Sequence, residues 1–300
     1  MAKHFMRIAD LGKDNVLKTI RRAKDMKETR FRGHCMDGKV AALIFEKAST
    51  RTRVSFELAV RHLGGSTVFM TPNESQLGRS EPLRDTARVL SRYVDCLIVR
   101  TFGQERLDEL AEFGSIPVVN ALTDQGHPCQ ILADLMTIYE RTPDFSSLRI
   151  AWIGDGNNMA ASWIEAASLL PFELTIASPK GYEPDPRLLD EAIKAGARIS
   201  FSYSPEEAIR GAHYVNTDVW ASMGQESEQK ARAKAFEKFC VSRELMALAS
   251  PDAKVLHCLP AHRGEEVTEE VIEGPASIVW DEAENRMHIQ TAILEWVFQD

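Results

Sequence analysis

The sequence predicts an α/β protein of two domains, each a parallel sheet flanked by helices, with the active site in the cleft between them. Short apolar strands alternate with amphipathic helices along the 300 residues. The alternation stops at residues 141–147, a connection with Pro, Ser and Asp, and then restarts. Polar residues cluster just after the strands, where open α/β sheets bind ligands. We therefore expect domains at 1–141 and 142–300, with a last helix near 283–300 that packs back on the first domain.

The composition predicts a soluble cytoplasmic protein. Hydrophobic residues make up 44% and charged residues 27%, which is ordinary for a globular chain. The formal net charge of -8 argues against nucleic acid as a partner, because binding it needs a basic face. No run approaches the roughly 18 apolar residues of a membrane span, and the start lacks a signal-peptide core. Five cysteines without a C-x-x-C pair favour free thiols in a reducing compartment.

The individual elements follow from periodicity. Residues 10–26 predict a helix, since Leu11, Val16 and Ile20 recur at helical spacing. Strands are expected at 39–45, 66–70, 96–100, 117–120, 149–154, 173–177, 198–201, 214–217 and 254–257. Helices are expected at 51–63, 82–92, 104–113, 128–139 and 282–298. Strands that alternate with helices of this length imply parallel sheets covered on both faces.

The most informative stretch is Ser49-Thr50-Arg51-Thr52-Arg53, where a strand gives way to a helix. The first N–H groups of a helix lack internal partners and carry the positive end of its dipole. Hydroxyl and guanidinium groups beside them suit a phosphate-like dianion. The alternative is a capped helix with solvated arginines.

Three more groups lie at or between strand ends of the first half. Arg100 ends one strand and can reach a phosphate or a developing oxyanion, or be solvated. His127-Pro128-Cys129-Gln130 follows the next strand and offers donors for a carbonyl oxygen, unless His127 is a capping or core residue. The polar loop at 75–81, which contains Gln76, is either functional or a surface loop.

Three groups follow strands of the second half. The turn Gly154-Asp155-Gly156-Asn157-Asn158 lacks the third glycine and the later acidic residue of a dinucleotide site, so its amides point instead to a polar ligand. Asp218 and Ser222 suit an α-amino group and its carboxylate, although a simple turn is possible. His257 and Cys258 lack the four looped ligands of structural zinc, so Cys258 is expected to orient an amine.

Together these motifs resemble the ornithine branch of the aspartate/ornithine carbamoyltransferase family. The Ser-Thr-Arg-Thr-Arg and His-Pro-x-Gln motifs are shared with aspartate carbamoyltransferases and specify only the carbamoyl phosphate half. Asp218-x-x-x-Ser222-Met223-Gly224 and His257-Cys258-Leu259-Pro260 resemble the ornithine branch. Ala48 stands where the family often has Pro.

The resemblance implies a role for each matching position. Arg100, His127, Cys258 and Thr52 are the expected catalytic residues. The residues implied to bind carbamoyl phosphate are Ser49, Thr50, Arg51, Thr52, Gln76 from a neighbouring subunit, Arg100, His127, Pro128, Cys129, Gln130, Cys258, Leu259 and Arg286. The residues implied to bind ornithine are Asn158, Asp218, Ser222 and Met223.

The reaction implied is transfer of the carbamoyl group from carbamoyl phosphate to the side-chain amine of L-ornithine, which gives citrulline and phosphate. The resemblance also implies a homotrimer with a shared active site and a place in arginine biosynthesis, with the reverse direction, arginine breakdown, as the alternative. We expect no cofactor and no metal, because phosphate is a good leaving group and the remaining rate enhancement comes from holding the two substrates close together. Putrescine or acetylated ornithine as acceptor, or a non-catalytic binding protein, remain alternatives.

Overall fold

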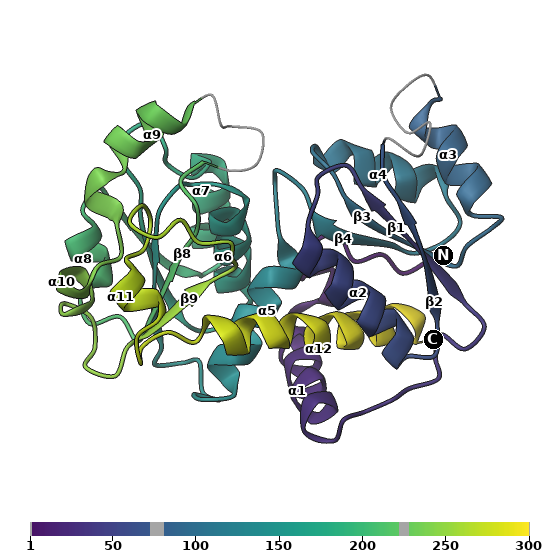
Figure 1. Ribbon diagram of the computed structural model, residues 1–300, viewed down its shortest axis with the longest axis horizontal. Helices are drawn as coiled ribbons and strands as arrows, with labels where there is room; N and C mark the ends of the chain where they lie inside the picture. Colours follow the sequence, from purple (N-terminus) through teal and green to yellow (C-terminus); the bar gives the residue numbers. More distant parts are fainter. Residues whose placement is uncertain (1, 73–80, 222–227, 300) are drawn as a thin grey trace. The chain divides into compact units, whose positions relative to one another are not determined.

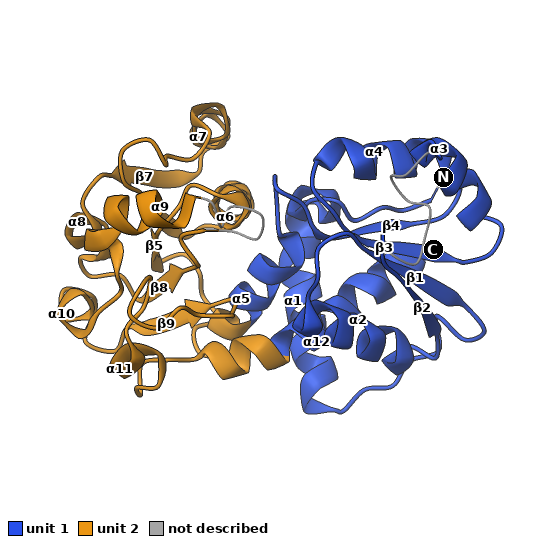
Figure 2. Ribbon diagram, turned by 45° about the horizontal axis from the view of Figure 1, so that its top comes forward, with its two compact units in different colours: residues 1–136, 285–300 blue, residues 137–284 orange. Residues whose placement is uncertain are grey.

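The computed structural model describes residues 2–72, 81–221 and 228–299, which fold into two compact units (Figures 1 and 2). Unit 1 comprises Met1–Met136 and Asn285–Asp300, and unit 2 comprises Thr137–Glu284. Two helices, α5 (Pro128–Tyr139) and α12 (Val279–Phe298), begin in one unit and end in the other. Unit 1 is therefore built from both ends of the chain.

Unit 1 contains a parallel sheet of four strands in the order β2-β1-β3-β4. The strands are β1 (Val40–Phe45), β2 (Ser66–Met70), β3 (Cys96–Arg100) and β4 (Val118–Leu122). The helices are η1 (Ile8–Leu11), α1 (Lys13–Glu28), α2 (Thr50–His62), α3 (Leu83–Leu90) and α4 (Gln104–Phe113), with α5 and the later part of α12. The four strands and the parallel sheet are as the sequence predicts.

Helices cover both faces of this sheet, as a parallel sheet requires. Alternate strand residues such as Ile44, Leu97 and Val99 pack with Ala87 of α3 and Leu107 of α4 in one apolar cluster. Helices α1, α2 and α12 lie on the opposite face (Figures 1 and 2).

The bounds of two helices differ from the prediction. The first helix is split, because Gly12 adopts a φ of 72° between the 3-10 turn η1 and α1. The last helix begins at Val279, three residues before the expected start. On α2, the apolar residues Val54 and Leu58 are 48% and 36% exposed.

Unit 2 contains a parallel sheet of five strands in the order β7-β6-β5-β8-β9. The strands are β5 (Arg149–Ile153), β6 (Glu173–Ala177), β7 (Arg198–Ser202), β8 (Tyr214–Thr217) and β9 (Lys254–His257). The helices are α6 (Asn158–Leu169), α7 (Pro186–Lys194), α8 (Pro205–Ile209), α9 (Gln229–Ala235), η3 (Glu237–Phe239), α10 (Arg243–Met246) and α11 (Glu269–Ile272).

The core of unit 2 follows the same rule of two covered faces. Helices α8, α10 and α11 pack with the strands in one apolar cluster that includes Ile153, Val215 and Val255. Helices α6 and α7 lie on the other face (Figure 2). Of the helices in the described ranges, none is long and apolar enough to cross a membrane.

Candidate active site

The junction between β1 and α2 is built as the sequence predicts. Ser49 is the N-cap of α2, and its Oγ accepts the backbone N–H of Thr52 at 3.3 Å. The same hydroxyl donates to Thr52 Oγ1 at 2.9 Å. Ser49 thereby fixes the first turn, and the partly positive N-terminus of α2 is placed at the carboxyl end of the sheet.

The two arginines of this turn differ in their surroundings. Nε of Arg51 is buried and has no hydrogen-bond partner among the described residues. Arg53 instead donates from Nε to Glu57 Oε1 at 2.8 Å, and its guanidinium stacks on Phe69 at 3.7 Å. The sequence suggested both arginines as anion ligands, but only Arg51 has a buried donor available for one.

A set of buried polar side chains gathers near this turn. Arg286 of α12 is 3% exposed and donates from Nη2 to Thr52 Oγ1 at 2.7 Å. Arg100 ends β3 level with Phe45, the last residue of β1. Both guanidinium groups act on His127: burial first, then Arg286 and Arg100, lower the pKa of His127 well below its usual value. The imidazole is therefore neutral at pH 7, near two buried guanidinium groups.

The first turn of α5 carries the rest of the His-Pro-x-Gln motif. Pro128 is the first residue of the helix, where a missing N–H costs little. The thiol of Cys129 donates to the backbone oxygen of Asn120 at 3.3 Å, and burial raises its pKa to about 12. Gln130 is fully buried and donates from Nε2 to Asp134 Oδ1 at 2.8 Å. The sequence reasoning missed Asp134, although its spacing of four from Gln130 was a usable signal.

A second group missed from the sequence joins the ends of β1 and β3. Glu46, directly after β1, accepts from Arg106 Nη2 at 2.6 Å and from the Thr101 hydroxyl. Its backbone N–H donates to the carbonyl oxygen of Arg100 at 2.8 Å. These bonds hold the backbone from which the Arg100 side chain extends.

In unit 2, the two asparagines of the turn after β5, Asn157 and Asn158, lie in different positions at the start of α6. Asn157 is the N-cap of α6, and its Oδ1 accepts the backbone N–H of Met159 at 2.9 Å and of Ala160 at 3.3 Å. The sequence suggested that both amides face a ligand. The oxygen of Asn157 is used by the helix, but its Nδ2 is buried without a hydrogen-bond partner among the described residues. Asn158 is the first residue of α6, and both asparagines stay candidates.

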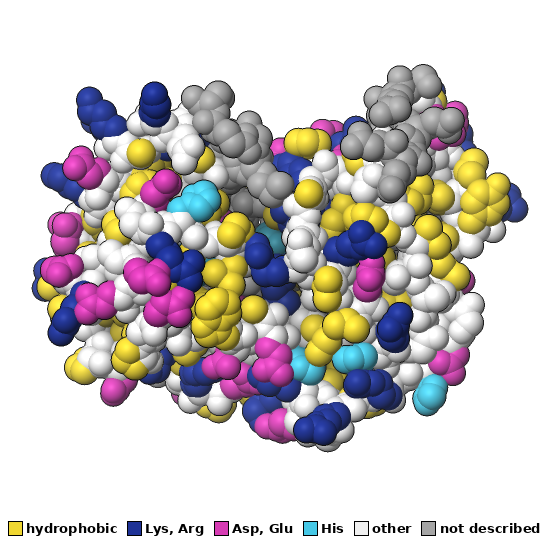
Figure 3. Space-filling model, viewed as in Figure 1, with side chains coloured by type: hydrophobic (Ala, Val, Ile, Leu, Met, Phe, Trp, Pro, Cys, Tyr) yellow, Lys and Arg dark blue, Asp and Glu magenta, His cyan; other side chains and the backbone are white. Residues whose placement is uncertain are grey.

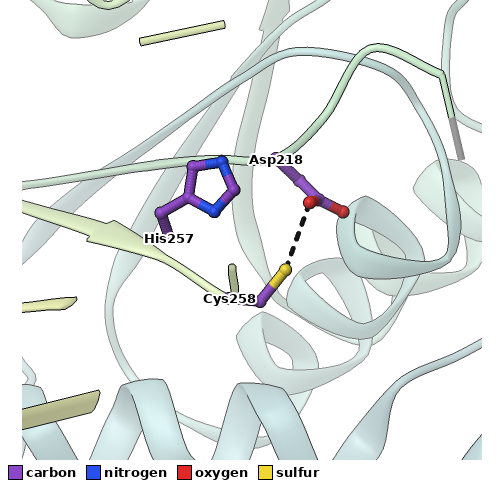
Figure 4. A group of neighbouring side chains, drawn as sticks. All are labelled: Asp218, His257 and Cys258. Carbon is purple, nitrogen blue, oxygen red and sulfur yellow. Dashed lines mark hydrogen bonds between the residues drawn. The ribbon is translucent and has the colours of Figure 1, made fainter. Parts of the chain in front are cut away.

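Asp218 and Cys258 meet at the carboxyl ends of β8 and β9 (Figure 4). The Cys258 thiol donates to Asp218 Oδ1 at 3.1 Å, and the Val219 N–H donates to the same oxygen at 2.8 Å. Asp218 is 8% exposed, and burial raises the pKa of its carboxyl group, against the opposing effects of His257 and these two hydrogen bonds. A cationic ligand beside Asp218 would favour its ionised form.

His257 is a structural neighbour of this pair. Its Nδ1 accepts the backbone N–H of Leu259 at 2.9 Å, and its Nε2 lies 3.0 Å from Glu266 Oε1. The tautomer with hydrogen on Nε2 satisfies both bonds. Leu259 has a φ of 58°, a strained value for a residue with a side chain, and the bond to His257 helps to hold it.

Potential metal-ligand atoms of Asp218, His257 and Cys258 lie within 4.8 Å of one another. Both ring nitrogens of His257 are already engaged, however, so a metal ion would have to displace one of these bonds. The residues present therefore fit an organic amine better than a metal ion.

A buried ion pair supports the segment that follows Asp218. Arg232 of α9 donates from Nη1 to Asp155 Oδ2 at 2.7 Å and to the Trp220 carbonyl oxygen at 2.8 Å. Its Nε donates to Glu228 at 3.0 Å, and its guanidinium stacks on Tyr182 at 4.9 Å. Sequence reasoning did not find this pair, because the partners are 77 residues apart.

Three predicted site residues, Gln76, Ser222 and Met223, lie outside the described residues. Contacts connect part of the remaining predicted set into two groups, and Thr50, Arg51, Pro128, Cys129, Gln130 and Asn158 are not joined to either by the same contacts. Unit 1 brings together Ser49, Thr52, Arg100, His127 and Arg286, and unit 2 brings together Asp218, Cys258 and Leu259.

Comparison with known proteins gives a consistent result over the whole chain. Residues 3–140 match the carbamoyl-P binding domain of the aspartate/ornithine carbamoyltransferase family, and residues 146–297 match its Asp/Orn binding domain. An ornithine carbamoyltransferase of Nitratidesulfovibrio vulgaris is 70% identical over 300 residues, covering 100% of both chains. One of Oleidesulfovibrio alaskensis is 67% identical over 299 residues and also covers 100% of both.

Solved structures agree with the sequences. The anabolic ornithine carbamoyltransferase of Campylobacter jejuni superposes with a TM-score of 0.94 at 42% identity and covers 98% of each chain. The ornithine carbamoyltransferase of Thermus thermophilus has a TM-score of 0.91 at 41% identity and covers 100% of each. The chain therefore belongs to the aspartate/ornithine carbamoyltransferase family.

Proposed function

We propose that this chain transfers the carbamoyl group of carbamoyl phosphate to the side-chain amine of L-ornithine, giving L-citrulline and phosphate. The observation that carries the proposal is a cluster of side chains in unit 1, where Thr52, Arg100, Arg286 and a neutral His127 gather near the carboxyl ends of parallel strands. Two buried guanidinium groups near the N-terminus of α2 concentrate positive charge in this part of unit 1, which suits a phosphate dianion.

Residues 1–141 are assigned to carbamoyl phosphate and residues 142–300 to ornithine, with the last helix, near 283–300, serving the first domain through Arg286. Ser49, Thr50, Arg51, Thr52 and Arg286 hold the phosphate, and Gln76 adds to them from a neighbouring subunit. The buried Nε of Arg51 and the N-terminus of α2 support this assignment. The segment 127–130 holds the carbamoyl group.

The chemistry uses donors that are already in position. The free amine of ornithine attacks the carbonyl carbon, negative charge grows on the carbonyl oxygen, and phosphate then leaves. Thr52, Arg100 and His127 donate to that oxygen, and donors aimed at developing charge stabilise the transition state more than the ground state. The departing phosphate takes the amine proton, so no separate general base is needed.

The ornithine side uses the groups of unit 2. Asn158, Asp218, Ser222 and Met223 hold the α-amino and α-carboxylate groups, and the α-ammonium group favours ionised Asp218. Cys258 and Leu259 lie beside the reacting amine. The 3.1 Å bond between Cys258 and Asp218 supports this grouping, because it joins the thiol to the carboxylate that binds the substrate.

The test is a citrulline assay with carbamoyl phosphate and four acceptors in parallel: ornithine, putrescine, acetylornithine and aspartate. We expect ornithine to be the preferred acceptor, because putrescine lacks the α-carboxylate and acetylornithine lacks the α-ammonium charge. A faster initial rate with any of the other three would overturn the choice of ornithine. Thermal shifts with both ligands but no product would instead identify a non-catalytic binding protein.

The chain is also proposed to form a homotrimer. Val54 and Leu58 of α2 and Val68 of β2 are 48%, 36% and 48% exposed on unit 1. Beside them lies a groove of about 370 Å³, lined in part by Glu57 and Arg61. Hydrophobic side chains gather over α2 between charged ones in Figure 3. An exposed apolar surface of this kind is typical of self-association, which light scattering would measure as a mass near three times 33.6 kDa.

A cytoplasmic enzyme of arginine biosynthesis is the expected cellular role. All five cysteines are free thiols, as in proteins of a reducing compartment. One structural relative is described as anabolic, which supports the biosynthetic direction. Restoration of growth without arginine in a bacterium that lacks its own ornithine carbamoyltransferase would test this role.

A further inference from the structure

A buried carboxylate lies one helical turn after Gln130 and has no role in the reaction described above. Asp134 and Gln130 are both 0% exposed and lie four residues apart on α5, so their side chains share one face of the helix. Gln130 Nε2 donates to Asp134 Oδ1 at 2.8 Å. The bond joins a group of the binding motif to a residue that sequence motifs do not single out.

This bond selects one of the two orientations of the Gln130 amide. An amide has a donor end and an acceptor end, whereas an ionised carboxylate only accepts. The NH₂ end of Gln130 faces Asp134 and donates to its Oδ1, whereas the reverse orientation would place the amide oxygen against a carboxylate oxygen. Oε1 is then directed away from Asp134.

The NH₂ group of a carbamoyl ligand needs an acceptor such as Oε1 of Gln130. Arg100, Arg286 and the hydroxyl of Thr52 bring donor groups to the same part of unit 1. Donors suit the phosphate and the carbonyl oxygen of carbamoyl phosphate. The NH₂ group of the ligand, in contrast, is itself a donor and requires an oxygen.

We propose that Asp134 is a positioning residue that fixes Gln130 with Oε1 toward the NH₂ group of the ligand, and that it thereby makes the site select a carbamoyl over an acyl phosphate. The inference rests on the proposed function, since it takes Gln130 as a ligand of the carbamoyl group. A site built to accept a hydrogen bond rejects an analogue without the donor, because its buried acceptor is then left unpaired.

The experiment compares two stable analogues that differ only in this group. Phosphonoacetamide carries the NH₂ group, and 2-oxopropylphosphonate carries a methyl group in its place. Their inhibition constants against carbamoyl phosphate are measured for the wild-type enzyme and for Asp134→Asn. Asparagine keeps the shape of Asp134 but has its own NH₂, which can donate to Oε1 and so permits the reversed amide.

In the wild-type enzyme, we expect the amide to bind at least about tenfold tighter than the ketone, as one buried hydrogen bond implies. In Asp134→Asn, we expect this preference to fall by about tenfold. The inhibition constant of inorganic phosphate and the KM for ornithine should stay within about twofold. A merely structural role would weaken the binding of all four ligands together and leave the ratio of the two analogues' inhibition constants unchanged.

An unchanged ratio in folded Asp134→Asn overturns the inference, and so does an equal loss for both analogues and phosphate. If that variant does not fold, Gln130→Leu provides the second test, since it removes Oε1 altogether. A wild-type preference in Gln130→Leu would also overturn the inference. Absence of citrulline formation by the wild-type enzyme would count against the proposed function instead.

Discussion

Replacement of Arg51 by alanine should weaken phosphate binding while it leaves the fold intact. Nε of Arg51 is buried without a hydrogen-bond partner among the described residues, so this atom ties no other described part of unit 1 in place. A charge-assisted hydrogen bond contributes about 1.5–3 kcal/mol. At least one such bond to phosphate is lost, so kcat/KM for carbamoyl phosphate should fall by roughly one to two decades.

The measurement is the initial rate of citrulline formation at saturating ornithine, with carbamoyl phosphate varied. Arg53→Ala is the matched control, because it removes the same charge two positions away. Arg53 is 46% exposed and paired with Glu57 at 2.8 Å, an exposed contact of about 0.3–0.5 kcal/mol. We expect Arg53→Ala to change kcat/KM by less than about twofold.

Thermal melting should separate the two ways in which Arg51→Ala can lose activity. Without ligand, its free energy of unfolding should stay within about 0.5 kcal/mol of wild type. With saturating inorganic phosphate, the stabilisation seen in wild type should be smaller. Activity within about threefold of wild type, or an equal loss in Arg53→Ala, would refute the assignment of Arg51 to the phosphate.

Three further predictions follow from the same contacts. The lowered pKa of His127 means that the unfolded chain binds a proton near pH 6.5 that the folded chain does not, so stability falls as the pH drops below about 6.5. In urea titrations from pH 5 to 7, His127→Gln should reduce the slope of the free energy of unfolding against pH by up to about 1.4 kcal/mol per pH unit. The same slope in the variant and the wild-type enzyme would contradict the lowered pKa. Cys258→Ser should raise the KM for ornithine more than that for carbamoyl phosphate, because its thiol contacts Asp218, and equal effects would argue against this role. Arg232→Met should lower the free energy of unfolding in urea by about 3–5 kcal/mol, since it leaves Asp155 buried without its ion-pair partner. Adding Asp155→Asn to that variant should recover part of the loss, and no recovery in the double variant would show that the two residues act independently.

Local patterns in the sequence were sufficient for the strands of both sheets, for the helices of the first half and for where chemistry occurs along the chain, but they gave no bounds for α6 to α11. Each strand and helix depends on the spacing of nearby apolar residues, so alternation alone predicted both parallel sheets. Polar groups that end a parallel strand lie at a known edge of the sheet, which marked Arg100, His127 and Asp218 before any contact was seen. The ends of helices were not predicted where a single residue sets them, as Gly12 does at the start of α1.

Contacts between distant residues were decided only by the tertiary structure. Arg286 reaches Thr52 across 234 positions, and Arg232 reaches Asp155 across 77. Such pairs form because the chain returns to a sheet that it left much earlier, and no local periodicity encodes where it returns. The same packing buries His127 near two guanidinium groups and so keeps it neutral, which its sequence neighbours do not determine.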